Sequence, residues 1–444
     1  MTVSRTVCVG FLTVITVGTL LLLLPFATAS GEWNNPIVAM FTATSAVCVT
    51  GLIVVDTGSY FSPVGQGIIL LLIQLGGLGY MTATTLLLLL LGRRLGLKDR
   101  LAIQQSLDTA ELSSASSLIK SIIAMTMIFE LSGAFLLMPR FADDYSAGRS
   151  LWLSLFHSIS AFNNAGFSLF ADSLVQYARS PWINGVIAAL VIIGGIGYQV
   201  IMELFIWARD RIRRKRHCQV FSLHFKVVTS TSLVLLVLGT LAFFAVEFAN
   251  PATLGGSPVN IKLMEAGFQS VIMRTAGFNS IDIGAMETSS LFIAIALMFI
   301  GASPGSTGGG IKTTTIRILL NCTRTVLKGE DEVLAYQREI PDKRVLKAVG
   351  VVVASAMTVV MVTILLSLTD PGIEFIALLF ETVSAFATVG LSTGITSELS
   401  TLGQLVIIVT MYIGRVGILM LMSALLGDPR PSTIHYPEED LLVG

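Results

Sequence analysis

Residues 274–278 read Arg274-Thr275-Ala276-Gly277-Phe278, a stretch in which a glycine follows small or polar residues and precedes a large apolar one. Three other segments share this form. Aligned on the glycine, the four segments are Ser45-Ala46-Val47-Cys48-Val49-Thr50-Gly51-Leu52, Ser160-Ala161-Phe162-Asn163-Asn164-Ala165-Gly166-Phe167, Val271-Ile272-Met273-Arg274-Thr275-Ala276-Gly277-Phe278 and Ser384-Ala385-Phe386-Ala387-Thr388-Val389-Gly390-Leu391. Successive glycines are 115, 111 and 113 residues apart. This period indicates fourfold internal duplication.

Apolar stretches long enough to cross a bilayer flank each glycine segment. Of the 444 residues, 53% are hydrophobic and 13% are charged, and the mean hydropathy is +0.81, so the chain belongs in a membrane. The predicted spans are 5–27, 65–92, 118–139, 182–207, 226–249, 288–320, 345–369 and 401–426. The first could be mistaken for a secretory signal, but it is long enough to span a bilayer.

These patterns predict an all-α polytopic membrane protein. Its four helix, pore-loop, helix repeats, with eight transmembrane spans, would surround a pseudo-fourfold pore. The expected repeats are residues 1–95, 96–210, 211–330 and 331–444.

Motifs of enzymes and metal centres are missing from the sequence. Its cysteines form no CxxC pair, and its histidines show no HExxH spacing. The stretch Gly305 to Thr313 imitates a phosphate-binding loop, but Ile311 separates the glycine from Lys312, and an apolar span replaces the expected strand. We therefore expect a protein that is not an enzyme.

Basic residues indicate the orientation of the chain. They concentrate in the linkers between repeats, at 93–120, 209–226 and 312–347, and short cytoplasmic loops are enriched in Lys and Arg. Both termini are therefore expected in the cytoplasm, and the glycine segments should open to the outside. For the linkers, a topology signal is favoured over a ligand site.

The four glycine segments are candidate filters for a monovalent cation. Rings of backbone carbonyls can replace the water around K⁺, and glycine permits the backbone angles that turn them towards an axis. No carboxylate precedes the glycines, which argues against divalent cations. Ordinary tight loops are the alternative. The expected filter residues are Cys48, Val49, Thr50, Gly51, Asn163, Asn164, Ala165, Gly166, Arg274, Thr275, Ala276, Gly277, Ala387, Thr388, Val389 and Gly390.

Arg274 is the discordant member of this set, because a guanidinium would repel K⁺. We expect it to point away from the path and to pair with Glu265 or Glu381 as a structural clamp, which is favoured over ion ligation.

Two features predict a gate below the filters. The sixth span is interrupted by Gly301, Ala302, Ser303, Pro304, Gly305, Ser306, Thr307, Gly308, Gly309 and Gly310, which cannot continue a regular helix. Arg415 lies inside the eighth apolar span, where it is expected to face the pore, with a helix-packing salt bridge as the alternative. The stretches 76–80 and 194–198 are glycine-rich and predict close helix packing.

With these residues in place, the sequence resembles the superfamily of potassium transporters that includes bacterial Trk and Ktr proteins and plant high-affinity potassium transporters. The similarity covers nearly the whole chain and is greatest to the Ktr membrane subunit, partly because the extra leading spans of Trk proteins are not present. The features that carry this resemblance are the four filter glycines, the residues 274–278, the 301–310 loop and Arg415.

That resemblance implies potassium transport by a homodimer with one pore per protomer, in a bacterial plasma membrane. It also implies sodium stimulation, with channel-like permeation and symport both left open, and a KtrA-type cytosolic ring that binds ATP or ADP and moves the gate. The basic linkers and the acidic residues 438–440 are candidate docking surfaces, and no nucleic-acid partner is expected. Among other classes, a carrier with alternating access is the main rival, but four repeats and no charged mid-membrane site apart from Arg415 speak against it.

Overall fold

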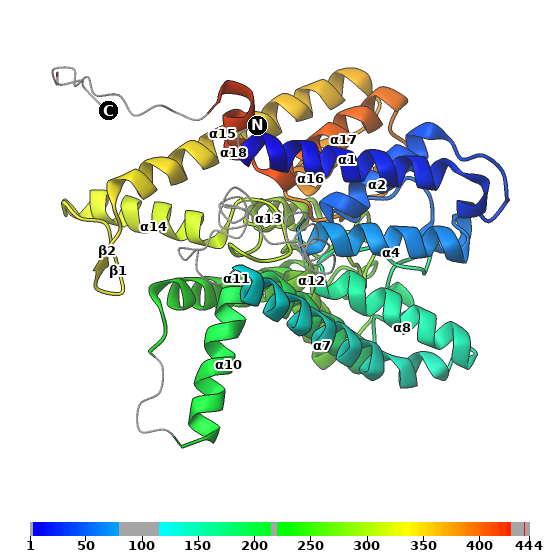
Figure 1. Ribbon diagram of the computed structural model, residues 1–444, viewed down its shortest axis with the longest axis horizontal. Helices are drawn as coiled ribbons and strands as arrows, with labels where there is room; N and C mark the ends of the chain where they lie inside the picture. The colour runs from blue at the N-terminus through cyan, green and yellow to red at the C-terminus, as the bar shows by residue number, and fades with distance from the viewer. Residues whose placement is uncertain (1–2, 80–114, 215–219, 428–438, 440–444) are drawn as a thin grey trace.

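The computed structural model describes residues 3–79, 115–214, 220–427 and 439, and the regular secondary structure of this part of the chain is almost entirely helical (Figure 1). Each repeat starts with a long helix. These four are α1 (Val3–Leu23), α7 (Ala115–Ala142), α11 (Leu223–Glu247) and α15 (Asp342–Thr369). They are the four single helices of the described chain that are long and apolar enough to cross a membrane.

A shorter helix follows the first helix of every repeat and ends at a glycine segment. These pore helices are α2 (Pro36–Cys48), α8 (Ala147–Phe162), α12 (Val259–Ile272) and α16 (Phe375–Phe386). At 12–16 residues they cannot cross a bilayer. Their last turns are almost entirely buried, because all four point into the centre of the protein.

The second apolar helix is broken near its middle in the second, third and fourth repeats, and in the first it is described only as far as α4 (Pro63–Gly77) and Gly79. The pieces are α9 (Pro181–Ile196) with α10 (Tyr198–Ile212), α13 (Thr288–Phe299) with α14 (Thr313–Lys328), and α17 (Thr401–Val416) with α18 (Ile418–Leu426). The bend is 103° between α9 and α10 and 92° between α17 and α18. The predicted spans 182–207 and 401–426 are thus each divided into two helices, a bend that was not predicted, whereas the interruption predicted in 288–320 is confirmed.

Glycines explain the bends, since Gly197 and Gly417 adopt φ of +96° and +84°, which residues with a side chain rarely adopt. The predicted span 65–92 can be followed only to Gly79, and most of the 93–120 linker lies outside the described residues. The remaining elements are α3 (Thr57–Tyr60), the 3₁₀ turns Pro25–Ala27, Val175–Tyr177 and Ile395–Ser397, and a hairpin of β1 (Leu334–Ala335) and β2 (Arg338–Glu339).

The repeats close into a ring. Each pore helix packs against the second helix of the repeat before it: α8 on α4, α12 on α9, α16 on α13, and α2 on α17. The last pair joins the fourth repeat to the first, so the ring has no open side. The predicted fold of four helix, pore-loop, helix repeats around a common axis is confirmed; the exact repeat boundaries stay predictions.

The start of α1 and the short helix α18 lie on one side of the ring. Arg5 Nε donates to the carbonyl oxygen of Ala424 at 2.7 Å, which places the start of α1 beside α18. The hairpin and the far end of α14 extend on the same side (Figure 1). This side carries Arg209, Arg211 and Lys328, so it is the side predicted to face the cytoplasm.

Candidate functional site

All four glycine segments have the same unusual backbone. The residue two positions before the glycine and the glycine itself both have positive φ in every repeat: Val49 and Gly51, Asn164 and Gly166, Thr275 and Gly277, and Thr388 and Gly390. Side chains disfavour this conformation. Four repetitions of a costly backbone at equivalent positions indicate that the conformation serves a function.

The four glycines meet at the axis of the ring. A methyl group on Gly51 would lie 2.5 Å from the carbonyl oxygen of Ala165, in the segment of the second repeat. The same relation continues around the ring at Gly166 and Ala276 (2.8 Å), Gly277 and Val389 (2.6 Å), and Gly390 and Thr50 (2.0 Å). Carbonyl groups from all four repeats therefore lie around one axis, and a side chain at any of the glycines would collide with a neighbouring segment.

Serine hydroxyls hold these segments in three of the four repeats. Six residues before the glycine, Ser45 Oγ accepts from Gly51 N at 3.0 Å, and Ser384 Oγ accepts from Gly390 N at 3.1 Å. Ser160 Oγ instead donates to the carbonyl oxygen of Phe167 at 2.8 Å. The third repeat has Val271 at this position, so its segment lacks the hydroxyl anchor.

The residues three positions before the glycines differ in their surroundings. Asn163 donates through Nδ2 to Glu130 Oε1 at 2.8 Å and to Gln74 Oε1 at 3.0 Å. Arg274 is half-buried, and its Nε has no partner. The expected pairing with Glu265 or Glu381 was wrong: the ion pairs of the described residues do not include Arg274, and Glu381 bonds to Thr396 instead.

The 301–310 stretch forms a loop directly under the ring. An isolated bridge between Ile300 and Ile311 closes its base. The amide of Gly309 donates to Thr388 Oγ1 at 3.1 Å, so the loop touches the fourth glycine segment. A methyl group on Gly308 would lie 2.2 Å from Thr275 Oγ1, so it also touches the third.

The other side of the loop packs on the broken helix of the second repeat. Ser303 N donates to the carbonyl oxygen of Gly195 at 3.1 Å, and Tyr198 N donates to that of Gly305 at 3.1 Å. These bonds use backbone groups left free by the break between α9 and α10. The break is thus a docking place for the loop.

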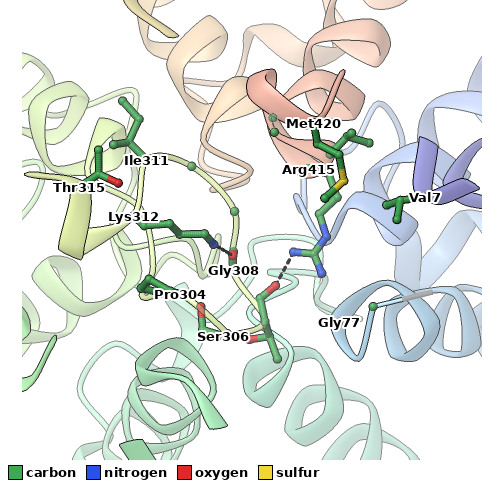
Figure 2. Close-up of a pocket in the computed structure, with 18 of the residues that line it drawn as sticks. Val7, Gly77, Pro304, Ser306, Gly308, Ile311, Lys312, Thr315, Arg415 and Met420 are labelled. Carbon is green, nitrogen blue, oxygen red and sulfur yellow. Dashed lines mark hydrogen bonds between the residues drawn. The ribbon is translucent and has the colours of Figure 1, made fainter. Parts of the chain in front are cut away.

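Arg415 holds the loop from the opposite wall. Its guanidinium donates to the carbonyl oxygens of Thr307, in the loop, and of Gly76, at the end of α4. Figure 2 shows the bond to the loop and, nearby, Lys312 Nζ donating to the carbonyl oxygen of Gly308 at 2.8 Å. Arg415 bonds backbone in this way and joins none of the ion pairs found among the described residues, which leaves the helix-packing salt bridge without support.

A cavity of about 680 Å³ lies around this loop, and both basic side chains line it (Figure 2). Its walls include the ends of two pore helices, at Phe162 and Phe386. In the described part of the chain, no group of three or more His, Cys, Asp or Glu side chains could hold a metal ion. A cation on the axis would meet backbone oxygens above and the positive charges of Arg415, Lys312 and Lys347 around the cavity below.

The glycine-rich stretches of the second helices do pack closely, as predicted. A methyl group on Gly76 would lie 2.0 Å from the carbonyl oxygen of Val47, and one on Gly194 would lie 1.9 Å from that of Phe162. The bond from Lys312 to the loop was not predicted, because in the sequence Lys312 is one more basic residue of a linker.

Comparison with known proteins agrees with this architecture. The family described as cation transport protein, TrkH, matches residues 5–427. Ktr system potassium uptake protein B of Bacillus subtilis is 40% identical over all of this chain and 97% of its own length. Potassium/sodium uptake protein NtpJ of Enterococcus hirae is 36% identical over 99% of this chain and 96% of its own length.

Among solved structures, that of the potassium transporter TrkH from Vibrio parahaemolyticus superposes with a TM-score of 0.73. It is 20% identical and covers 95% of this chain and 84% of its own, so it supports the fold. The relatives are transporters rather than enzymes, as expected from the sequence. Because the family match spans nearly the whole chain and includes the ring, the loop and Arg415, this protein belongs to the TrkH family of cation transport proteins.

Proposed function

We propose that this chain is the pore-forming subunit of a potassium uptake system, with the four glycine segments as its selectivity filter. The observation that carries the proposal is the ring in which the carbonyl group before each glycine lies against the glycine of a neighbouring repeat. Carbonyl oxygens in such a ring can replace the hydration shell of a cation without a fixed charge that would trap it. The potassium uptake named in its relatives supports K⁺ as the ion.

The 301–310 loop and Arg415 act as the gate. The loop lies across the axis below the filter, bonded to Thr388 on one side and to Arg415 on the other. It contains five glycines and one proline among its ten residues, and it is held by hydrogen bonds rather than by a helix. Loss of those bonds would open a path from the filter to the cavity.

A separate protein moves this gate. We infer a KtrA-type cytosolic ring that binds ATP or ADP, because the relatives are named as parts of a Ktr system and the loop leads directly into α14 on the basic side of the protein. We also propose a homodimer in the bacterial plasma membrane with both termini in the cytoplasm. Sodium stimulation is supported by the potassium/sodium uptake named in one relative.

The test is uptake of rubidium at low external K⁺ by cells without uptake systems of their own, expressing this chain with a Ktr-type regulatory subunit. Gly277→Ser is compared with wild type, since a Cβ at Gly277 would lie 2.6 Å from the carbonyl oxygen of Val389. Gly256→Ser is the matched control, because no atom lies within 4 Å of a Cβ there.

We expect wild type and Gly256→Ser to take up rubidium with the same affinity, and Gly277→Ser to lose affinity or to admit Na⁺. If wild type takes up no rubidium with a functional partner, or if Gly277→Ser takes up rubidium as wild type does, an alternating-access carrier would be the better explanation.

A further inference from the structure

Two polar side chains lie buried behind the filter on opposite sides of the ring. Nine residues before the glycine, the four pore helices carry Thr42, His157, Phe268 and Glu381. His157 and Glu381 are both 0% exposed. Buried polar groups in a membrane protein are costly unless they are bonded, and they are usually functional.

His157 reaches the segment that leaves the second filter. Its Nδ1 lies 2.8 Å from the carbonyl oxygen of Leu153, which can only accept, so this nitrogen donates. Its Nε2 lies 3.0 Å from Ser168 Oγ, and Ser168 is the second residue after Gly166. The pore helix is thus tied to the outer end of its own filter.

Ser168 extends this connection to the third repeat. Its hydroxyl lies 3.3 Å from the carbonyl oxygen of Ser173, and Ser173 Oγ accepts from Asn279 N at 3.2 Å. Asn279 is the second residue after Gly277. Because Nδ1 of His157 carries the ring proton, Nε2 accepts the single hydroxyl proton of Ser168, and contacts continue from Ser168 through Ser173 to the outer end of the third filter.

Glu381 makes an equivalent connection in the fourth repeat. Its carboxyl group accepts from the hydroxyl of Thr396, whose Oγ1 lies 2.9 Å from Ser392 Oγ. Ser392 is again the second residue after the filter glycine, Gly390. Because the glycine ring runs in sequence order, the second and fourth repeats face each other across the axis.

The other two repeats lack this connection. Two residues after Gly51 stands Ile53, which has no polar side-chain atom, and the pore helix of the third repeat carries the apolar Phe268. The polar pairs are therefore a feature of two opposite filters, and the pore helices do not need them in order to form.

We propose that His157 and Glu381 are positioning residues that set the preference of the filter for K⁺ over Na⁺. They brace the outer ends of opposite filters through Ser168 and through Thr396 with Ser392. One source of potassium selectivity is a carbonyl ring that resists contraction around the smaller ion. These hydrogen-bonded contacts on opposite sides of the ring, here called braces, hinder that contraction. This inference rests on the proposed function of the ring.

Competition between rubidium and sodium tests the braces. In cells expressing the chain with a Ktr-type regulatory subunit, His157→Phe, Ser168→Ala and Glu381→Leu should each reduce discrimination against Na⁺ by about fivefold, the equivalent of one ordinary hydrogen bond. The maximal rubidium rate should change less than the affinity. Glu381→Gln, which keeps an acceptor oxygen for Thr396, should restore most of the discrimination.

Thr42→Val is the matched control, since Thr42 occupies the same pore-helix position and is 2% exposed. It should leave discrimination unchanged. The double variant His157→Phe with Ser168→Ala should discriminate no worse than either single variant, because each substitution alone already removes the same contact, the one between His157 and Ser168. Purified variants are checked for potassium-dependent thermal stabilisation, which would be smaller where the brace is lost.

Unchanged discrimination in Ser168→Ala and His157→Phe, an equal loss in Thr42→Val, or fully additive losses in the double variant would overturn the inference. A wild type that fails to discriminate K⁺ from Na⁺ would instead refute the proposed filter. The two failures are therefore distinguishable.

Discussion

Replacement of Arg415 by glutamine should release the loop from the inner end of the pore. The guanidinium donates to two backbone oxygens, one on Thr307 and one on Gly76. A hydrogen bond from a charged group contributes about 1.5–3 kcal/mol, and only the bond to Thr307 joins Arg415 to the loop, so Arg415 holds the loop by about that amount. The ratio of open to closed loops should therefore rise by up to about 100-fold.

The assay is rubidium uptake into proteoliposomes that contain the purified chain without a regulatory partner. Arg415→Gln should conduct much faster than wild type. Arg415→Lys keeps the charge but cannot present a planar fork to two separate carbonyls, so an intermediate rate is expected. Lys312→Met removes the bond to Gly308 at 2.8 Å and should raise the rate by about tenfold.

These variants separate two roles of Arg415. If the arginine acts only as an electrostatic barrier, Arg415→Lys should behave as wild type. If it acts by holding the loop, the lysine variant should lie between wild type and Arg415→Gln. A rate for folded Arg415→Gln at or below that of wild type would refute the gate itself.

Two further substitutions test the packing of glycine around the pore. Gly309→Ala places a methyl group 2.3 Å from Thr388 Oγ1, so it should push the loop off the filter and raise the rubidium rate without a partner; an unchanged rate would contradict this contact. Gly414→Ala places one 1.9 Å from the carbonyl oxygen of Phe386, a backbone atom that cannot turn aside. It should lower the melting temperature in detergent by several degrees, whereas Gly350→Ala, which faces open space, should not.

The fourfold arrangement was predictable because it repeats along the chain. Each filter glycine recurs with an apolar residue after it and a span on either side, and the structure adds positive φ at the glycine and two positions before it. No propensity rule identifies Val49 or Thr388 as a residue with positive φ. That conformation is imposed by the ends of four pore helices converging on one axis.

The breaks in the second helices could not be read from hydropathy. The apolar pattern runs on through Gly197 and Gly417, and a single glycine is tolerated in a helix at a cost of about 1 kcal/mol. The chain bends there because each helix packs on the carbonyl end of a pore helix, as Gly414 does on Phe386, and because the released backbone groups bond elsewhere. Both causes lie in other parts of the sequence.

The error at Arg274 has a similar origin. A buried arginine was expected to find a carboxylate, and Glu381 was near enough in the repeat pattern to be considered. The structure commits Glu381 to Thr396 in its own repeat. A prediction that pairs residues by side-chain type alone does not consider which face of a pore helix each residue occupies. That face depends on how the pore helices pack in the ring.

The four repeats share one backbone conformation at the filter but differ in their side chains, and these two properties serve different functions, selection and gating. An axial site for a cation needs four similar contributions, and the backbone angles of the filter are indeed alike in every repeat. A gate needs the opposite, because four equal loops would have to open together. Among the breaks in the described residues, only that of the third repeat is a ten-residue loop. In the sequence, only the fourth repeat has a cation, Arg415, where the others carry glycine or alanine. One loop held by one arginine can open without disturbing the filter above it, so selection and gating can be altered by separate substitutions.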